Sequence, residues 1–402
     1  MIKLKQAIIL CGGLGTRLRP LTLSTPKIMV ECNGNPFLFY LIKQLSDQKI
    51  SNIILCTGYK NQVINKYLEN NYFKKVKIDT YFSSTNTKTG TRLKKIENKL
   101  DDFFLLLYSD NYTNLSLDKR LKIFSQNNKL IDLTVVKKNN GNILINKNNQ
   151  VSYSMTRSKK SQFVEVSYSI CSKKILKLHS NSHKDFQNIL YQVSKSNQLS
   201  VTINDSYQSI SDPNRLNKTK DYFKQKRIIF IDRDGVINKK PKKGCYVTNP
   251  NELIFLNNNL NYLMFLSKFD FKFIIVTNQA GINRGMINKK DYKKINNKIS
   301  RVFKKKKINL LEIFTCPHHW IENCNCRKPR AGLFFNISKK YNLNLGQYVF
   351  IGDSISDMET TKETYSKGIF INNKTPIKTK YISTFKNLAS TKNFIFNHYG
   401  IK

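Results

Sequence analysis

The chain has 402 residues, of which 40% are hydrophobic and 11% aromatic, which is enough apolar material for roughly two or three folded domains and excludes a disordered chain. Its 69 lysines and arginines outnumber its 26 aspartates and glutamates, which gives a formal net charge of +43. These cations are spread over the whole length without a helix-turn-helix, RNA-binding or basic-zipper pattern. We therefore interpret them as compositional bias and affinity for anionic small substrates, with nucleic-acid binding as the weaker alternative.

No apolar run approaches the roughly 20 residues that a membrane-spanning helix needs, so we expect no membrane insertion. The N-terminal segment 1–13 (MIKLKQAIILCGG) runs straight into glycines and has no small-residue cleavage site. It therefore predicts a first β-strand and not a signal peptide. Without a secretory signal, the eight cysteines are expected to be reduced in a cytoplasmic protein.

Two segments, beginning at residues 6 and 226, each run from an apolar strand into a loop that carries a motif. The stretch 214–226 (NRLNKTKDYFKQK) before the second segment is polar and charged. We predict two domains, residues 1–222 and 223–402. In each, strand-like runs alternate with helix-like runs, which predicts α/β architecture with parallel strands. In such sheets the loops at the carboxyl ends of the strands carry the chemistry.

The first half opens with a glycine-rich loop that directly follows a predicted strand. Gly12, Gly13 and Gly15 would let backbone N–H groups approach phosphates closely. Arg17 and Lys27 follow in the same string, GGLGTRLRPLTLSTPK. The string resembles the signature of sugar-1-phosphate nucleotidyltransferases, and the runs NIILCTGYK and FFLLLYSDNY extend the likeness.

This resemblance implies a Rossmann-like three-layer domain with a mixed sheet, which transfers a nucleotidyl group from an NTP to a sugar 1-phosphate and releases pyrophosphate. It implies that the three glycines and Arg17 hold the triphosphate, and that Lys27 contacts phosphate at the reacting centre. Asp110 would hold Mg²⁺. The run FVEVSYSI resembles a family segment whose acidic residue, here Glu165, touches sugar hydroxyls.

Several positions of the first half depart from that family's pattern. Ser209 stands where an aspartate is expected as the second metal ligand, and Asp212 is three residues displaced from it. Ser109 replaces a glycine before Asp110, and Asn35 replaces a common lysine. A non-catalytic module that binds nucleotide or sugar is therefore the open alternative for this half.

The second half opens with a pair of carboxylates, Asp232 and Asp234, at the end of an apolar strand. Strand alternation puts both on one side, where they repel each other unless a cation lies between them. A solvated Asp-Gly turn is the other interpretation. Later strand ends add polar residues in order: Thr277 after FKFIIV, Lys328 within RKP, and Asp353 after YVFIG.

These four stations resemble the haloacid dehalogenase-like phosphatases, over roughly residues 226–395. The resemblance implies a parallel sheet and a mechanism in which Asp232 attacks phosphorus to form an aspartyl-phosphate. Asp234 would act as acid and then as base. Mg²⁺ would be held by Asp232, the Asp234 backbone carbonyl and Asp353, while Thr277 and Lys328 hold the phosphate oxygens.

A cluster of soft ligands precedes this lysine in the string CPHHWIENCNCRKP. Its C-x-H-x₅-C-x-C spacing predicts a closed zinc site from Cys316, His318, Cys324 and Cys326. We leave His319 out, because two adjacent side chains rarely reach one small ion. The zinc would fold the loop and direct the following cations toward the phosphate site.

Zinc-loop members of this family include the D-glycero-D-manno-heptose 1,7-bisphosphate 7-phosphatases and the histidinol-phosphatases. The runs VTNQAGINRG and GCYVTNPNELIFL look like the heptose group. By that resemblance, the substrate contacts are Asn278, Gln279, Arg284 and Arg327.

The two halves together predict a bifunctional enzyme of nucleotide-activated heptose synthesis for surface polysaccharide. Its partners would be phosphorylated sugars and NTPs, and its cofactors Mg²⁺ and Zn²⁺. The alternative is a phosphatase alone, for heptose bisphosphate or histidinol phosphate, joined to a binding module. Fusing two consecutive steps raises the local concentration of the intermediate.

Overall fold

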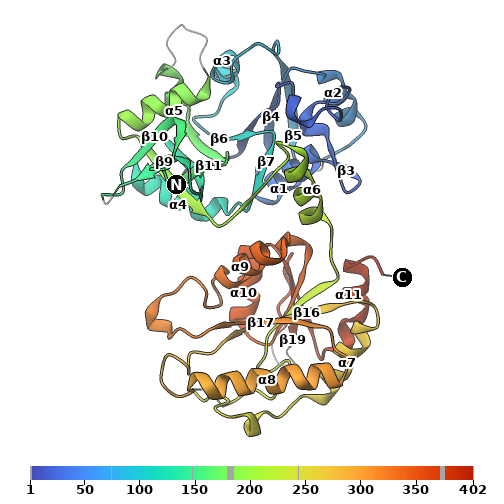
Figure 1. Ribbon diagram of the computed structural model, residues 1–402. Coiled ribbons are helices and arrows are strands. Elements are labelled where there is room, and N and C mark those ends of the chain that lie inside the picture. The colour runs from blue at the N-terminus through green and yellow to red at the C-terminus, as the bar shows by residue number, and fades with distance from the viewer. Residues whose placement is uncertain are drawn as a thin grey trace. The chain divides into compact units, whose positions relative to one another are not determined.

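The computed structural model describes residues 2–73, 75–146, 148–178, 185–242, 244–371 and 376–401. The chain forms two compact units, Met1–Phe223 and Lys224–Lys402, which are blue to green and yellow to red in Figure 1. No helix in the described ranges is both long and apolar enough to cross a membrane.

Unit 1 is built on a mixed sheet of ten strands. In sheet order they are β10 (Val151–Ser158), β9 (Gly141–Ile145), β11 (Phe163–Glu165), β8 (Ile131–Lys137), β12 (Ser169–Ser172), β6 (Phe103–Tyr108), β1 (Gln6–Leu10), β4 (Asn52–Thr57) and β5 (Lys77–Phe82), with β13 (Leu199–Asn204) on β8. The four strands from β6 to β5 are parallel. Along the path from β6 through β12 to β10 each pair is antiparallel, whereas β13 is parallel to β8. The sheet is mixed, as the family resemblance implied, although alternation alone predicted parallel strands.

Helices cover both faces of this sheet. They are α1 (Phe37–Asp47), α2 (Asn61–Glu69), α3 (Thr89–Lys95), α4 (Leu117–Asn127), α5 (Phe186–Lys195) and α6 (Pro213–Phe223), and the short strands are β2 (Glu31–Cys32), β3 (Asn35–Pro36), β7 (Asn111–Thr113) and β14 (Tyr207–Ser209). Strand β1 shows why three layers form: Ile9 packs in one apolar core and Ile8 in another. Successive side chains of a strand point to opposite faces, so a strand that is apolar throughout needs a layer on each side.

Unit 2 has a six-stranded sheet in which every pair is parallel. Its order is β17 (Leu310–Cys316), β16 (Lys272–Asn278), β15 (Ile228–Ile231), β18 (Val349–Gly352), β19 (Lys367–Ile371) and β20 (Ile382–Phe385). Its helices are α7 (Asn257–Ser267), α8 (Lys289–Lys305), α9 (Gly332–Tyr341), α10 (Ile355–Thr364) and α11 (Lys392–His398). The α/β fold class is therefore confirmed in both units.

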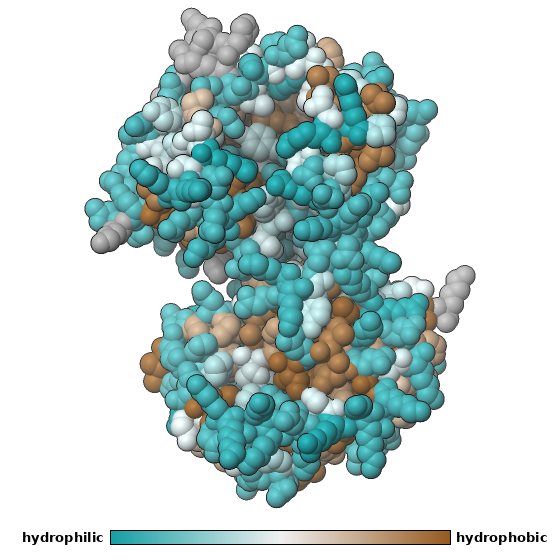
Figure 2. Space-filling model, in the orientation of Figure 1, coloured by the Kyte–Doolittle hydropathy of each residue, from teal (hydrophilic) through white to brown (hydrophobic). Residues whose placement is uncertain are grey.

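The strand order of unit 2 reverses at β15, because β16 follows on one side and β18 on the other. Parallel α/β sheets bind ligands in the crevice at such a reversal, at the carboxyl ends of the strands. Helix α8 shows how the layers are held: Ile295, Ile299 and Phe303 are buried, while lysines fill its outer side. The face of the molecule seen in Figure 2 is accordingly hydrophilic over most of its area.

Candidate active sites

Three segments of unit 2 contact the Nζ atom of Lys328: the loop after β15, strand β16 and the first turn of α10. Its Nζ lies 2.7 Å from Asp232 Oδ1 and 2.7 Å from Asp357 Oδ1, and it donates to the Val276 carbonyl at 2.8 Å. The residue is only 4% exposed. Burial opposes its charged form, but the two carboxylates outweigh burial and raise the pKa of Lys328. The lysine is thus a fixed cation beside the first aspartate of the strand β15 loop.

The Asp232 carboxyl is buried at the end of β15. Burial raises its pKa to about 7, Asp357 and Asp234 add to this increase, and Lys328 acts in the opposite direction. A cation placed among these carboxylates would favour the ionised form of Asp232, which is the form that a nucleophile needs.

Three carboxylates of unit 2 form a cluster that suits a divalent cation. Asp232, Asp353 and Asp357 each offer an oxygen, and these atoms lie within 4.8 Å of one another. Asp353 Oδ1 is buried and has no hydrogen-bond partner in the part of the chain that the structure describes. Oxygen ligands of this kind fit Mg²⁺. Sequence reasoning did not assign Asp357 to the metal, although it was visible four residues after Asp353.

The side chain of Asp234 lies outside this cluster and is held by three donors. Arg233 donates to both of its oxygens at 2.9–3.1 Å. Asn238 and Gln279 each donate to it at 2.8 Å. Arg233 is fully buried, and its role was not predicted from the sequence because arginine between two aspartates reads as a surface residue.

Asn278 and Gln279 contact catalytic candidates, although we expected contacts with substrate. Asn278 clamps the backbone of Lys328: its Oδ1 accepts from the lysine N–H and its Nδ2 donates to the lysine carbonyl, both at 3.1 Å. Gln279 is fully buried and also donates to Thr277 Oγ1 at 2.9 Å. Both side chains are therefore placed to position other groups of the site.

Gly235 leaves the space that the Asp353 carboxylate occupies in the cluster. Its φ of +87° is a left-handed conformation, and a Cβ there would lie 2.1 Å from Asp353 Oδ2. We expect Gly235→Ala to displace this carboxylate and to reduce, by about 10²-fold, the phosphatase turnover that the sequence resemblance implies, since this is the typical effect of misplacing a group by ~1 Å. Phosphate release, followed beside a thermal melt, measures it.

Gly400→Ala is the matched control for this change. Gly400 also has a positive φ, +63°, but a Cβ there would meet nothing within 4 Å. The control should lose only the strain of a left-handed alanine, roughly 1–2 kcal/mol of stability, and keep its turnover. Equal loss of turnover in the two variants would contradict the proposed role of Gly235.

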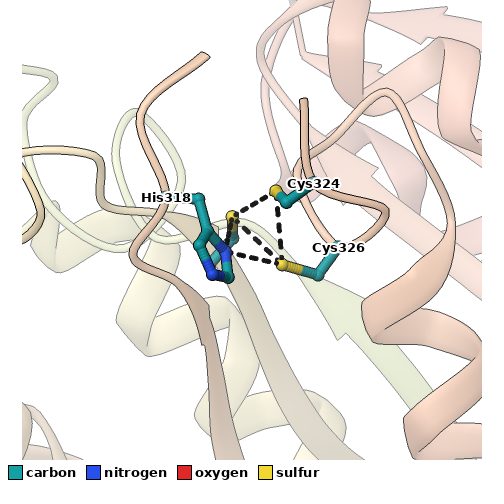
Figure 3. Close-up of side chains that lie close together, drawn as sticks. His318, Cys324 and Cys326 are labelled. Atoms are coloured by element: carbon teal, nitrogen blue, oxygen red, sulfur yellow. Dashed lines mark hydrogen bonds between the residues drawn. The ribbon is translucent and has the colours of Figure 1, made fainter. Parts of the chain in front are cut away.

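The four predicted zinc ligands form a closed cluster at the end of β17. The Sγ atoms of Cys316, Cys324 and Cys326 lie 3.4–3.6 Å apart, and His318 Nδ1 lies 3.1 Å from Cys326 and 3.6 Å from Cys316. Figure 3 shows the donor atoms pointing toward one another. Tetrahedral zinc with bonds of about 2.0–2.3 Å places its donor atoms about 3.5–3.8 Å apart, close to these separations, so the set fits a structural zinc ion.

The loop that carries this cluster is held by hydrogen bonds between its own residues. Arg330 donates to the carbonyls of Asn323 at 2.5 Å and Cys324 at 2.7 Å. His319 accepts from the Ile321 N–H and stacks on Trp320, which leaves it outside the cluster. This hydrogen-bonded loop leads directly into Lys328.

Arg327 and Arg284 also lie by this loop. Arg327 donates to the His318 carbonyl at 3.4 Å. The Arg284 guanidinium lies over the rings of Trp320 and Tyr246, at 5.2 and 5.9 Å from their centroids. Among the described contacts, neither arginine bonds to the carboxylate cluster, so both remain candidates for substrate.

Unit 1 holds a cleft of about 950 Å³ at the carboxyl ends of β1 and β6. All of the residues predicted for this half line it, namely Gly12, Gly13, Gly15, Arg17, Lys27, Asp110 and Glu165. Lys27 Nζ donates to Asp110 Oδ2 at 2.6 Å. The cleft therefore brings together the glycine-rich loop, the two predicted cations and two carboxylates, which come from segments distant in sequence.

Arg92 packs against Gly12 of the glycine-rich loop and was not predicted. It is buried and donates to the backbone carbonyls of Thr57, Ser84 and Thr87. A Cβ on Gly12 would lie 2.2 Å from its Nη1, so Gly12 is needed for this close approach. An arginine inside a basic stretch gives no sequence signal of such burial.

Glu165 and Asp110 are the paired acids of the cleft. Burial and then Asp110 raise the pKa of Glu165 to about 7, and its Oε1 is buried without a partner among the residues described. Ser209 hydrogen-bonds Ser211, and Asp212 accepts from the Arg215 N–H at the start of α6. Neither of these two positions supplies the second carboxylate that the family pattern has there.

Two family models match the chain: nucleotidyl transferase over residues 6–143, and polynucleotide kinase 3 phosphatase over residues 226–376. The chain is 31% identical to D-glycero-alpha-D-manno-heptose-1,7-bisphosphate 7-phosphatase of Campylobacter jejuni, across 42% of this chain and 95% of the relative. It is 33% identical to the corresponding beta-heptose enzyme of Helicobacter pylori, across 39% and 88%. A structure of HddC from Yersinia pseudotuberculosis is 26% identical, with a TM-score of 0.48, across 55% and 99%.

Proposed function

Since this chain belongs to the D-glycero-D-manno-heptose-1,7-bisphosphate 7-phosphatase family, we propose that unit 2 removes the 7-phosphate from that sugar bisphosphate. We further propose that unit 1, which carries the nucleotidyl transferase match, joins the resulting sugar 1-phosphate to a nucleotide. The observation that carries the first step is the convergence of Asp232, Lys328 and Asp357 at one edge of the sheet. Cytoplasmic location suits substrates of this class.

Phosphoryl transfer begins with attack of Asp232 on the phosphorus of the 7-phosphate, which forms an aspartyl-phosphate and breaks the bond to the sugar oxygen. Asp234 enters this step in its protonated form and gives that proton to the departing oxygen, which leaves it as a carboxylate. It then takes a proton from the water that hydrolyses the aspartyl-phosphate. Lys328 and Thr277 hold the phosphate oxygens, where charge develops in the transition state.

The supporting residues keep this arrangement fixed. Gln279 orients Asp234 and Thr277, and Asn278 orients the backbone of Lys328. Magnesium held by Asp232, Asp353, Asp357 and the Asp234 carbonyl would neutralise charge between the nucleophile and the phosphate. Arg284 and Arg327 are proposed to contact the remainder of the bisphosphate, because both lie beside the loop that precedes Lys328.

Nucleotidyl transfer in unit 1 requires an oxygen of the sugar 1-phosphate to attack the α-phosphorus of the NTP, with release of pyrophosphate. The backbone N–H groups of Gly12, Gly13 and Gly15 are proposed to hold the triphosphate together with Arg17. Magnesium bound by Asp110 would neutralise phosphate charge. Lys27 would contact the reacting phosphate, and Glu165 the sugar hydroxyls.

The substrate of unit 2 is tested by phosphate release from D-glycero-D-manno-heptose 1,7-bisphosphate, compared with histidinol phosphate under the same conditions. We expect a kcat/KM for the heptose bisphosphate at least about 10²-fold higher, because two cations beside the zinc loop suit a second phosphate. A preference for histidinol phosphate would overturn the assignment.

The zinc cluster is proposed as a clasp that fixes Lys328. We expect Cys324→Ser to lower the zinc content and to reduce phosphate release by about tenfold or more, because the loop loses its fixed geometry. Metal analysis and phosphate release measure the two effects. Cys245→Ser is the control, since that cysteine is exposed and outside the cluster. Full phosphate release from a zinc-free Cys324→Ser protein would contradict the clasp.

A second candidate for unit 1 is a binding module without catalysis. The observation in its favour is that Ser209 occupies the position of an expected metal ligand and hydrogen-bonds Ser211. Such a module would bind NTP and sugar phosphate but would release no pyrophosphate.

A further inference from the structure

A second lysine contacts the carboxylate cluster of unit 2, and the proposed catalytic steps do not use it. Lys240 lies on the loop that follows Asp232 and Asp234. Its Nζ lies 2.8 Å from Asp353 Oδ2. Its side chain is 53% exposed, whereas that of Asp353 is 15% exposed.

The two oxygens of Asp353 have different surroundings. Oδ1 is buried and has no hydrogen-bond partner in the described ranges. Oδ2 accepts the bond from Lys240. Asp353 is packed against Gly235, where even a Cβ would meet Oδ2 at 2.1 Å. Within the described residues, one oxygen of the Asp353 carboxylate is therefore without a hydrogen-bond partner, and the other accepts a hydrogen bond from the Lys240 ammonium group.

The two lysines of the cluster differ in their freedom to move. Lys328 is 3% exposed and is held by Asp232, Asp357 and a backbone carbonyl. Among the described residues Lys240 pairs with Asp353 alone, and its side chain is more than half exposed. Exposed ion pairs are weak. A cation that enters the cluster would therefore displace Lys240 before Lys328.

Electrostatic repulsion between the bound ion and the Lys240 ammonium group would drive this displacement. An ammonium group at hydrogen-bond distance from a ligand carboxylate lies within a few ångströms of any ion bound by that carboxylate. Like charges at that separation repel, even with the screening of a partly exposed site. The ion and Lys240 therefore cannot both be bound favourably at Asp353.

We infer that Lys240 competes with the divalent cation for Asp353, so that it lowers the metal affinity of the phosphatase site and swings into solvent when the metal binds. This inference rests on the proposed metal site of unit 2. Lys240 is then a positioning residue that acts through Asp353 and sets the concentration of divalent cation at which the site fills. In the metal-free protein, Lys240 partly neutralises three carboxylates that would otherwise repel one another.

The test is direct metal binding without substrate. Mn²⁺ is titrated into the full-length zinc-loaded protein, and free Mn²⁺ is followed by electron paramagnetic resonance. Asp353→Asn identifies the site, as the binding that this variant loses. We expect Lys240→Met to bind Mn²⁺ at that site about tenfold more tightly than the wild type, because one repelling charge is removed.

Two variants serve as controls for charge and position. Lys240→Arg keeps the cation and should restore the wild-type affinity to within about twofold. Lys239→Met removes the same charge one residue away, from an exposed side chain that forms no ion pair in the described part of the chain, and should also stay within about twofold because solvent screens it.

Equal tightening in Lys239→Met and Lys240→Met would overturn the inference, since general charge would then explain it. Unchanged or weaker binding in Lys240→Met would also overturn it, because Lys240 would then have no competing role. If Asp353→Asn lost no binding, the proposed metal site would fail and the inference with it. Only this last result would also count against the proposed phosphatase function; the other two would overturn the inference about Lys240 alone.

Discussion

Asp232→Asn should abolish phosphate release from the heptose bisphosphate, by about 10⁴-fold or more, because an amide oxygen cannot replace the carboxylate as the attacking group. The substitution keeps the size of the side chain. It also removes one of three neighbouring negative charges, so folding should persist even though Lys328 loses a partner. Phosphate release and a thermal melt measure the two effects.

The same variant should retain pyrophosphate release when sugar 1-phosphate is supplied, because every residue proposed for nucleotidyl transfer lies in unit 1. Asp270→Asn is the matched control: it makes the same chemical change in unit 2 at an exposed aspartate and should leave phosphate release intact. Substantial turnover by a folded Asp232→Asn protein would remove the covalent mechanism.

The second large effect is expected in the other unit. Asp110→Asn should reduce pyrophosphate release by about 10³-fold or more, because the change removes the proposed magnesium ligand and the ion-pair partner of Lys27. Phosphate release by unit 2 should be unchanged. Coupled detection of pyrophosphate with the sugar 1-phosphate as substrate measures the loss.

Asp212→Asn tests whether Asp212 is a metal ligand of the transferase cleft or a structural residue at the start of α6. Asp212 accepts from the Arg215 N–H at the start of α6 and pairs with its side chain. Asparagine keeps the oxygen that accepts from the Arg215 N–H, so the substitution should cost only about 0.3–0.5 kcal/mol of stability, from the lost charge at the helix N-terminus. It should leave most of the pyrophosphate release. A loss as large as that of Asp110→Asn would make Asp212 a metal ligand and would contradict a purely structural role for it.

Motif positions could be predicted from the sequence because both sheets gather strand ends at one edge. Asp232, Thr277 and Asp353 each follow an apolar run, and in a parallel sheet the carboxyl ends of neighbouring strands lie together. The convergence of Cys316, His318, Cys324 and Cys326 was likewise predictable, since they fall within eleven consecutive residues, and their role as zinc ligands stays a proposal.

Partners of individual side chains could not be predicted, because they depend on rotamers and on tertiary contacts. Asn278 follows Thr277 directly, yet it clamps Lys328, which is 50 residues away in sequence. Arg92 reads as one cation of a basic stretch, and only the fold brings it against Gly12. The orientation of the Asp357 side chain depends on the first turn of α10, where Asp357 forms a capping box with Ser354.

The central claim is that one chain performs two consecutive steps, and ³¹P NMR of one reaction tests it most directly. D-glycero-D-manno-heptose 1,7-bisphosphate is mixed with Mg²⁺, the full-length protein and each of the four NTPs in turn. We expect inorganic phosphate to appear first, followed by pyrophosphate and a sugar-linked diphosphate with one of the NTPs. Phosphate without pyrophosphate in all four reactions would contradict the claim and leave unit 1 as a binding module.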